Sequence, residues 1–276
     1  MFHLATQAVR MDAKQPAKAH DAAALLTLPG LRLSRGAGPL TPYSWPSTST
    51  DSEDLAKNYP NTWLFASAPH GRQLCVATAV GPRTVITAGH CIDPAKTYKL
   101  LQNNSSLTAR CVKPPDGETG EECDKTKRAK DVAVCTLDPP DQPDLFLAPG
   151  GRYESIDTKT PAAAGAVVLV TFTACTGGTP RDVVAPISLQ VDSWPSPSVQ
   201  SVALAGKSTA ICPRDSGGPW MGATSPRVVA LHVCHEGSSS WGVALDQESV
   251  QEFLRQQESG GKAPLCGLSA SAAMCR

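Results

Sequence analysis

The stretch Cys212-Pro-Arg-Asp-Ser-Gly-Gly-Pro-Trp220 is the most informative part of this chain of 276 residues. Glycine and proline follow Ser216 directly, so the sequence predicts a tight turn between two β-type segments, with the serine hydroxyl on it. Ser-Gly-Gly-Pro alone predicts only a turn, so a structural turn with no catalytic role is the alternative to a nucleophile. A serine at neutral pH needs a neighbouring base, and that base needs an orienting acid. Ser216 is therefore a candidate nucleophile only if the chain supplies both.

A base and an acid are available upstream. His90 closes the β-branched segment Val85-Ile-Thr-Ala-Gly-His-Cys91, and Asp131 opens the strand-like segment Asp131-Val-Ala-Val134. Taken singly, such a histidine is more often packed or solvated, and such an aspartate is more often a solvated strand end. Their occurrence in the order His, Asp, Ser indicates one catalytic set.

At these residues the chain resembles the trypsin/chymotrypsin-like serine peptidases of bacterial type. The family motifs read TAGHC, DVAV and RDSGGP here, and Cys75 precedes Cys91 at the spacing of the family's histidine-loop disulfide. The resemblance spans about residues 55 to 258. It implies an all-β fold of two six-stranded antiparallel β-barrels, at about 55–145 and 150–248, with the active site in the cleft between them and a C-terminal helix.

The resemblance also implies roles for the site residues. His90 would take the proton of Ser216 and later give it to the leaving amine, while Asp131 would hold the imidazole tautomer. The oxyanion hole would use the backbone N–H groups of Ser216 and Arg214, where the family usually has glycine. Arginine enters glycine's conformations only at a cost, so we expect the hole either to be strained or to form only when substrate binds. The Arg214 side chain either attracts an acidic substrate residue or is solvated.

Specificity depends on the pocket beside the nucleophile. The family's pocket-floor position holds Ala210, followed by Ile211, so no carboxylate is available to neutralise a buried Lys or Arg of the substrate. The segment Val228-Val-Ala-Leu-His-Val233 resembles a strand of bacterial glutamyl endopeptidases, which places His232, with Val233, in the substrate-binding site. Acidic substrate residues are one expectation and small or medium apolar residues are the other. A histidine satisfied inside the core is the alternative for His232.

Composition limits the partners. Lys and Arg total 25, Asp and Glu total 25, and the formal net charge is +0, so the chain has no basic field for nucleic acid or an anionic membrane. Protein or peptide substrates are expected. The protein is expected to be a monomer and to use no cofactor. No C-x-x-C or H-x-x-x-H spacing occurs, so no metal site is predicted. A catalytically weak homologue that binds a protein partner is the alternative to a serine endopeptidase.

Ten cysteines favour disulfides and an oxidising compartment, hence secretion. The first 30 residues carry charges and no long apolar run, which leaves a cytoplasmic protein as the alternative. The family resemblance implies that Cys75 pairs with Cys91 and Cys212 with Cys234. Local spacing suggests Cys111 with Cys123 and Cys266 with Cys275, leaving Cys135 and Cys175.

The ends of the chain differ from its middle. Residues 1–54 are rich in Ala, Pro, Ser and Thr and are expected to be a linker or a pro-segment. Val250, Phe253 and Leu254 recur at helical spacing within residues 247–257, which predicts a helix that packs on the domain. Residues 259–276 form a tail that contains two cysteines.

Overall fold

The computed structural model describes the chain from residue 60 onward, with gaps. The described residues are 60–67, 73–102, 105–115, 130–141, 143–145, 151–158, 166–176, 179–191, 199–204, 214–222, 225–236, 239–260, 264–269 and 273–275. For strands β8 to β10, only the backbone is described. The expected linker or pro-segment (residues 1–54), Cys123, Ala210, Ile211 and Cys212 lie outside these residues. No helix in the described part of the chain is long and apolar enough to cross a bilayer.

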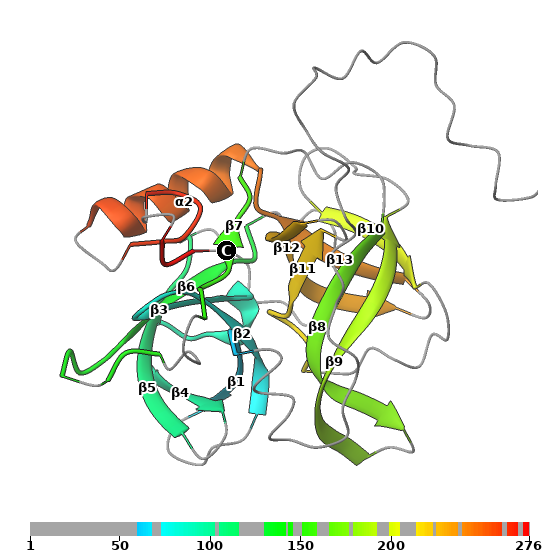
Figure 1. The fold of residues 1–276 in the computed structure, drawn as a ribbon, viewed down its shortest axis with the longest axis horizontal. Helices are drawn as coiled ribbons and strands as arrows, with labels where there is room; N and C mark the ends of the chain where they lie inside the picture. The colour runs from blue at the N-terminus through cyan, green and yellow to red at the C-terminus, as the bar shows by residue number, and fades with distance from the viewer. Residues whose placement is uncertain are drawn as a thin grey trace, which may run out of the picture. The chain divides into compact units, whose positions relative to one another are not determined.

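Six strands form a closed first barrel in the order β1-β2-β3-β6-β5-β4. Each strand pairs antiparallel with its neighbours. Burial alternates along β4 and much of β5, as expected when one face of each strand points into a barrel. The interior includes stacked Phe65 and Tyr98 rings, with centroids 4.6 Å apart. The strands are β1 (Thr62–Ser67), β2 (Gln73–Gly81), β3 (Thr84–Thr87), β4 (Thr97–Gln102), β5 (Ser105–Val112) and β6 (Ala133–Leu137) (Figure 1).

Six further strands form the second barrel. They pair in the order β11-β8-β9-β10-β13-β12, and the pairing of β11 with β12 closes the ring. The expected pair of six-stranded antiparallel barrels is thus confirmed, with the short strand β7 (Ser155–Ile156) added in parallel to β12. The strands are β8 (Ala166–Thr176), β9 (Thr179–Val191), β10 (Val199–Leu204), β11 (Pro219–Gly222), β12 (Ser225–Glu236) and β13 (Ser239–Ala244).

The expected C-terminal helix is also present. Helix α2 (Glu248–Ser259) buries Val250, Phe253 and Leu254, the three residues that the periodicity selected. The side chain of Gln251 donates to the carbonyl of Thr158 at 2.8 Å, which ties the helix to the segment after β7.

The tail after the helix packs on the first barrel. The N–H of Cys266 donates to the carbonyl of Val80 in β2 at 2.7 Å, and the carbonyl of Cys266 accepts from the N–H of Ile156 in β7 at 2.8 Å. Leu265 and Cys266 are 1% and 0% exposed, so the tail contributes to the core. Because β7 also pairs with β12, this tail bonds to the end of one barrel and to a strand attached to the other.

Three disulfides lie fully within the described residues, and one of them corrects the predicted pairing. Cys75–Cys91 and Cys266–Cys275 are bonded as expected. Cys111, however, bonds Cys135, so the pairing of Cys111 with Cys123 was wrong, and Cys135 is unavailable to Cys175. Strand register explains this result: the antiparallel pairing of β5 and β6 sets Cys111 directly opposite Cys135, with a Cα–Cα distance of 4.0 Å.

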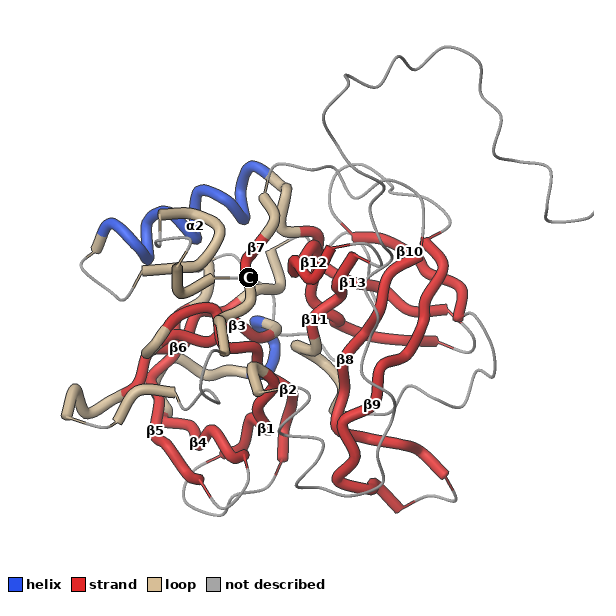
Figure 2. The backbone as a smooth tube through the Cα atoms, in the orientation of Figure 1, coloured by secondary structure: helices blue, strands red, loops and turns tan. Residues whose placement is uncertain are grey.

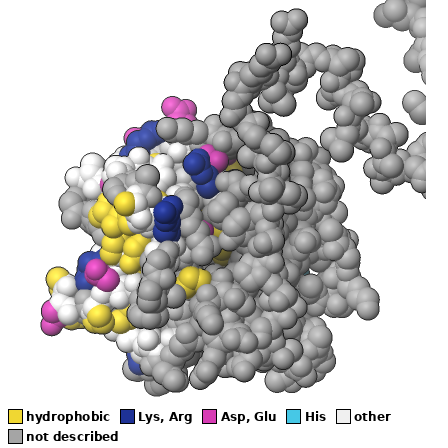
Figure 3. Space-filling model, in the orientation of Figure 1, with side chains coloured by type: hydrophobic (Ala, Val, Ile, Leu, Met, Phe, Trp, Pro, Cys, Tyr) yellow, Lys and Arg dark blue, Asp and Glu magenta, His cyan; other side chains and the backbone are white. Residues whose placement is uncertain are grey.

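Cys234 is also disulfide-bonded, and no described cysteine is free. Its expected partner, Cys212, lies outside the described residues. On the face drawn in Figure 3, acidic and basic side chains of the described residues are interspersed, consistent with the net charge of +0.

Candidate active site

His90 lies on a single helical turn between barrel strands. The turn η1 (Gly89–Cys91) follows the end of β3, as Figure 2 shows, and Cys91 is bonded to Cys75 on β2. Gly89 allows the turn to approach Asp131, because a Cβ there would lie 3.1 Å from the Asp131 Oδ1 atom. The disulfide and this close approach together restrain the backbone position from which the His90 side chain extends.

Asp131 holds His90 through both carboxylate oxygens. Oδ1 accepts the backbone N–H of His90 at 2.7 Å, and Oδ2 lies 2.7 Å from Nδ1 of the ring. The Asp131 side chain is 0% exposed and that of His90 is 19% exposed. A buried carboxylate is stable only when hydrogen bonds replace its water. With Nδ1–H donated to Asp131, Nε2 carries the lone pair and can act as a base.

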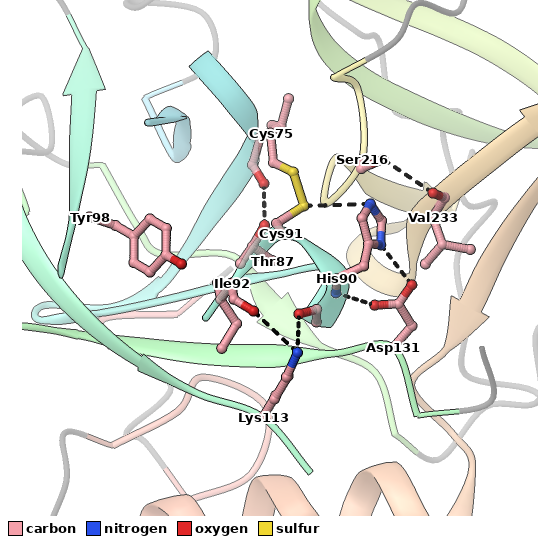
Figure 4. Close-up of a disulfide and its surroundings, with 12 residues drawn as sticks. Cys75, Thr87, His90, Cys91, Ile92, Tyr98, Lys113, Asp131, Ser216 and Val233 are labelled. Carbon is pink, nitrogen blue, oxygen red and sulfur yellow. Dashed lines mark hydrogen bonds and ion pairs between the residues drawn. A yellow bond between two sulfur atoms is a disulfide. The ribbon is translucent and has the colours of Figure 1, made fainter. Parts of the chain in front are cut away.

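Ser216 lies on the turn that leads into β11. Its carbonyl accepts the N–H of Val76 on β2 at 2.8 Å, so the turn touches the first barrel next to the Cys75–Cys91 disulfide. Its hydroxyl donates to the carbonyl of Val233 on β12 at 3.1 Å (Figure 4). A hydroxyl carries one proton and turns about its C–O bond. The Ser216 hydroxyl must therefore leave Val233 to donate to His90.

Gly217 makes this junction between the barrels possible. Its φ is +84°, and a Cβ there would lie 2.2 Å from the carbonyl oxygen of Val76 and 2.3 Å from Oγ1 of Thr87. Its N–H donates to the carbonyl of His232 on β12 at 2.7 Å. A side chain at this position would separate the Ser216 turn from β2.

Arg214 has the backbone that its position in the sequence predicts. Its φ is +86°, and it is the one described non-glycine residue with a positive φ. Glycine enters this region freely, whereas a residue with a Cβ enters it at a cost. The chain therefore keeps a glycine-like conformation with an arginine side chain, and the strain expected there is present.

The residues expected to recognise substrate are only partly described. His232 is 1% exposed, its N–H donates to the carbonyl of Gly218 at 2.8 Å, and its ring lies 6.3 Å from the rings of Trp220 and His235. His235 is half-buried, and burial lowers the pKa of its imidazole. Val233 is 1% exposed and contacts Ser216 through its carbonyl. The sequence assigned no role to His235, which follows Cys234 on the same strand.

One group of potential metal ligands occurs among the described residues, made of Cys75, His90 and Cys91. The two cysteines are bonded to each other, so neither offers a thiolate. Cys91 Sγ lies 3.7 Å from Nε2 of His90. The Cys75–Cys91 disulfide thus lies beside the imidazole of His90.

Lys113 was missed by the sequence reasoning and lies beside the same turn. Its Nζ donates to the carbonyls of Gly89 at 3.3 Å and Ile92 at 3.1 Å. The signal was its spacing: Leu107, Ala109 and Cys111 face the barrel interior at every second residue, and Lys113 is next in that series.

Comparisons with known proteins identify the family and the fold. The family profile named Trypsin matches residues 54–250 of the chain. Among solved structures, neuropsin, a serine protease expressed in the limbic system of mouse brain, is similar with a TM-score of 0.57 and 12% sequence identity. That similarity covers 74% of this chain and 96% of neuropsin, and it concerns the fold. No curated protein sequence matches the chain.

Proposed function

This chain belongs to the trypsin family of serine peptidases, and on that basis we propose that it cleaves peptide bonds through a catalytic triad of Ser216, His90 and Asp131. Family membership makes the protein a serine endopeptidase, a hydrolase that acts on proteins or peptides. The observation that carries the triad is the pair of hydrogen bonds between His90 and Asp131, with distances of 2.7 Å at both the backbone N–H and Nδ1. It leaves Nε2 as the base.

The reaction begins when the Ser216 hydroxyl turns from the Val233 carbonyl toward Nε2 of His90. Oγ attacks the carbonyl carbon of the scissile bond while its proton moves to Nε2, and the carbonyl oxygen becomes an oxyanion. The buried Asp131 carboxylate stabilises the imidazolium. Collapse of the tetrahedral intermediate breaks the C–N bond, and the Nε2 proton moves to the leaving amine. Water then repeats the sequence on the acyl-enzyme and releases the acid.

The oxyanion is assigned to the N–H groups of Arg214 and Ser216. The φ of +86° at Arg214 supports this assignment, because the backbone keeps a conformation suited to glycine in spite of the side chain. Hydrogen-bond donors fixed before the reaction stabilise charge that develops in the transition state, and one such donor is worth roughly 10²- to 10³-fold in kcat. This geometry favours an active enzyme over a protein-binding homologue.

Strand β12 supports a preference for substrates with an acidic residue before the cleaved bond. His232 and His235 bring two imidazole rings within 6.3 Å of each other, next to the nucleophile turn. Protonated imidazoles attract a carboxylate, and burial lowers the pKa of His235, so this preference should strengthen as the pH falls. Small apolar residues are the competing preference, motivated by Ala210 and Ile211.

Labelling with a fluorophosphonate probe tests the triad. Wild-type protein should be labelled, while Ser216→Ala and heat-denatured protein should not. His90→Ala should label far more slowly, because the hydroxyl loses its base. Equal labelling of Ser216→Ala would exclude Ser216 as the nucleophile, and a peptide library cleaved by the labelled enzyme would separate acidic from apolar preference.

We infer an oxidising compartment, and hence secretion, from the described disulfides. Two of them, Cys75–Cys91 and Cys111–Cys135, lie in the barrel that carries His90. A thiol titration of denatured protein purified from its natural source should find few free thiols. Ten free thiols would instead support the cytoplasmic alternative.

A further inference from the structure

Lys113 and Asp131 hold the turn of His90 by different groups. Asp131 bonds the N–H and the ring of His90, whereas the Nζ of Lys113 bonds the carbonyls of Gly89 and Ile92, at the start of the turn and just after its end (Figure 4). The carbonyl of Gly89 also accepts the N–H of Ile92 at 3.2 Å. The Lys113 ammonium therefore adds a second donor to the Gly89 carbonyl and also supplies a donor to the Ile92 carbonyl, just after the turn ends.

A disulfide joins the two strands whose ends carry these side chains. Lys113 follows β5 and Asp131 precedes β6, and the register pairs Val112 with Val134. Cys111–Cys135 crosslinks the two strands at the adjacent pair. The residues that grip the His90 turn from two sides therefore come from strand ends that are joined both by backbone hydrogen bonds and by a covalent bond.

The charges near Lys113 favour this arrangement. Burial lowers the pKa of the Lys113 amine, and the carboxylates of Asp131 and Asp93 oppose that shift. Asp93 in turn pairs with Lys96 at 3.3 Å. The charged form of the Lys113 amine is thus favoured by two carboxylates, one of which is that of the buried Asp131.

We propose that Lys113 is a positioning residue for the catalytic base: it clamps the carbonyls of the η1 turn so that the His90 ring stays on Asp131 and presents Nε2 to Ser216. The inference rests on the triad proposed above. Lys113 touches neither the substrate nor the reacting atoms. Its effect should therefore fall on the rate of acylation and leave substrate binding unchanged.

The test compares three variants of the whole chain, with Lys113→Gln as a fourth variant that checks whether a loss of folding is specific to Lys113→Met. Lys113→Met keeps much of the aliphatic stem and removes the donors, and kcat should fall roughly ten- to hundredfold with KM unchanged, since small misplacements of a catalytic group have effects of this size. Lys113→Arg keeps charge and donors and should recover most of the loss. Lys96→Met is the matched control, because it removes a nearby charge whose side chain is 68% exposed, and its kcat should equal that of wild type.

A proton NMR spectrum gives a readout independent of turnover. The Nδ1–H proton bonded to Asp131 should give a downfield resonance that shifts or broadens in Lys113→Met and returns in Lys113→Arg. A Lys113→Met protein with kcat within twofold of wild type and an unchanged resonance would overturn the proposal. So would failure of Lys113→Met and Lys113→Gln to fold, which would show a role in stability alone. An inactive wild type would instead refute the triad, and the resonance would still test Lys113.

Discussion

Replacing Arg214 with glycine should stabilise the protein, although it deletes a large side chain. At a φ of +86°, an L-residue costs about 1–2 kcal/mol relative to its preferred region. Glycine removes that cost but adds about 0.5–1 kcal/mol of backbone entropy to the unfolded chain. The difference predicts a gain of about 0.5–1 kcal/mol in the free energy of unfolding, with kcat at least equal to that of wild type because the N–H donor is retained.

Arg214→Ala separates the backbone from the side chain. It removes the same arginine contacts but keeps a Cβ at positive φ, so it should be less stable than Arg214→Gly. Urea unfolding of both variants measures the difference, and acylation by a fluorophosphonate probe reports the oxyanion hole. A glycine variant less stable than the alanine variant would show that Arg214 is not strained. A roughly 10²-fold fall in kcat for glycine alone would show that the arginine holds its own N–H in place.

Three other positions give sharp expectations. Gly217→Ala should abolish labelling and lower the thermal midpoint strongly, because its Cβ would lie 2.2 Å from the carbonyl oxygen of Val76; a folded, active variant would contradict this packing. Replacing Cys266 and Cys275 together by serine should lower the free energy of unfolding in urea by roughly 2–3 kcal/mol, as expected for a short loop, while the kcat of the folded protein stays within about twofold of wild type. Burial lowers the pKa of folded His235 below the ordinary value of 6.5, so between these two pKa values the unfolded chain binds more protons than the folded protein, and stability should fall as the pH drops through that window. Urea unfolding of His235→Gln should lack this pH-dependent component, and a variant with the same pH profile of stability as wild type would contradict the prediction.

The catalytic candidates could be predicted because each lies in a local motif. His90, Asp131 and Ser216 were selected by short segments and their order, and the structure brings the first two to hydrogen-bonding distance while bonding the Ser216 backbone to β2. Even the unusual φ of Arg214 followed from its position, because a turn requires a conformation whatever residue fills it. Local rules of this kind are properties of the sequence.

The errors arose where partners are set by strand register. Pairing Cys111 with Cys123 used separation along the chain, but the β5–β6 register sets Cys135 opposite Cys111. Lys113 was missed for the same reason, since its contacts with Gly89 and Ile92 join segments that are distant in sequence. The separation of two cysteines along the chain sets only the entropic cost of closing the loop between them. Which residues face each other across two strands depends on the whole barrel.

The same barrel explains why its disulfides lie where they do. Cys75–Cys91 fixes the end of the His90 turn to β2, and one residue further along β2 the N–H of Val76 bonds the Ser216 carbonyl. Cys111–Cys135 joins the strand ends that carry Lys113 and Asp131. Both disulfides restrain segments that approach the His90 imidazole. A disulfide that served only to restrict the unfolded chain would not need to lie near this ring. A base that must keep its ring aligned through proton transfer gains most from such anchoring, because misplacement affects the barrier directly. The crosslinks of this barrel therefore support the geometry of the proposed triad as well as the stability of the barrel.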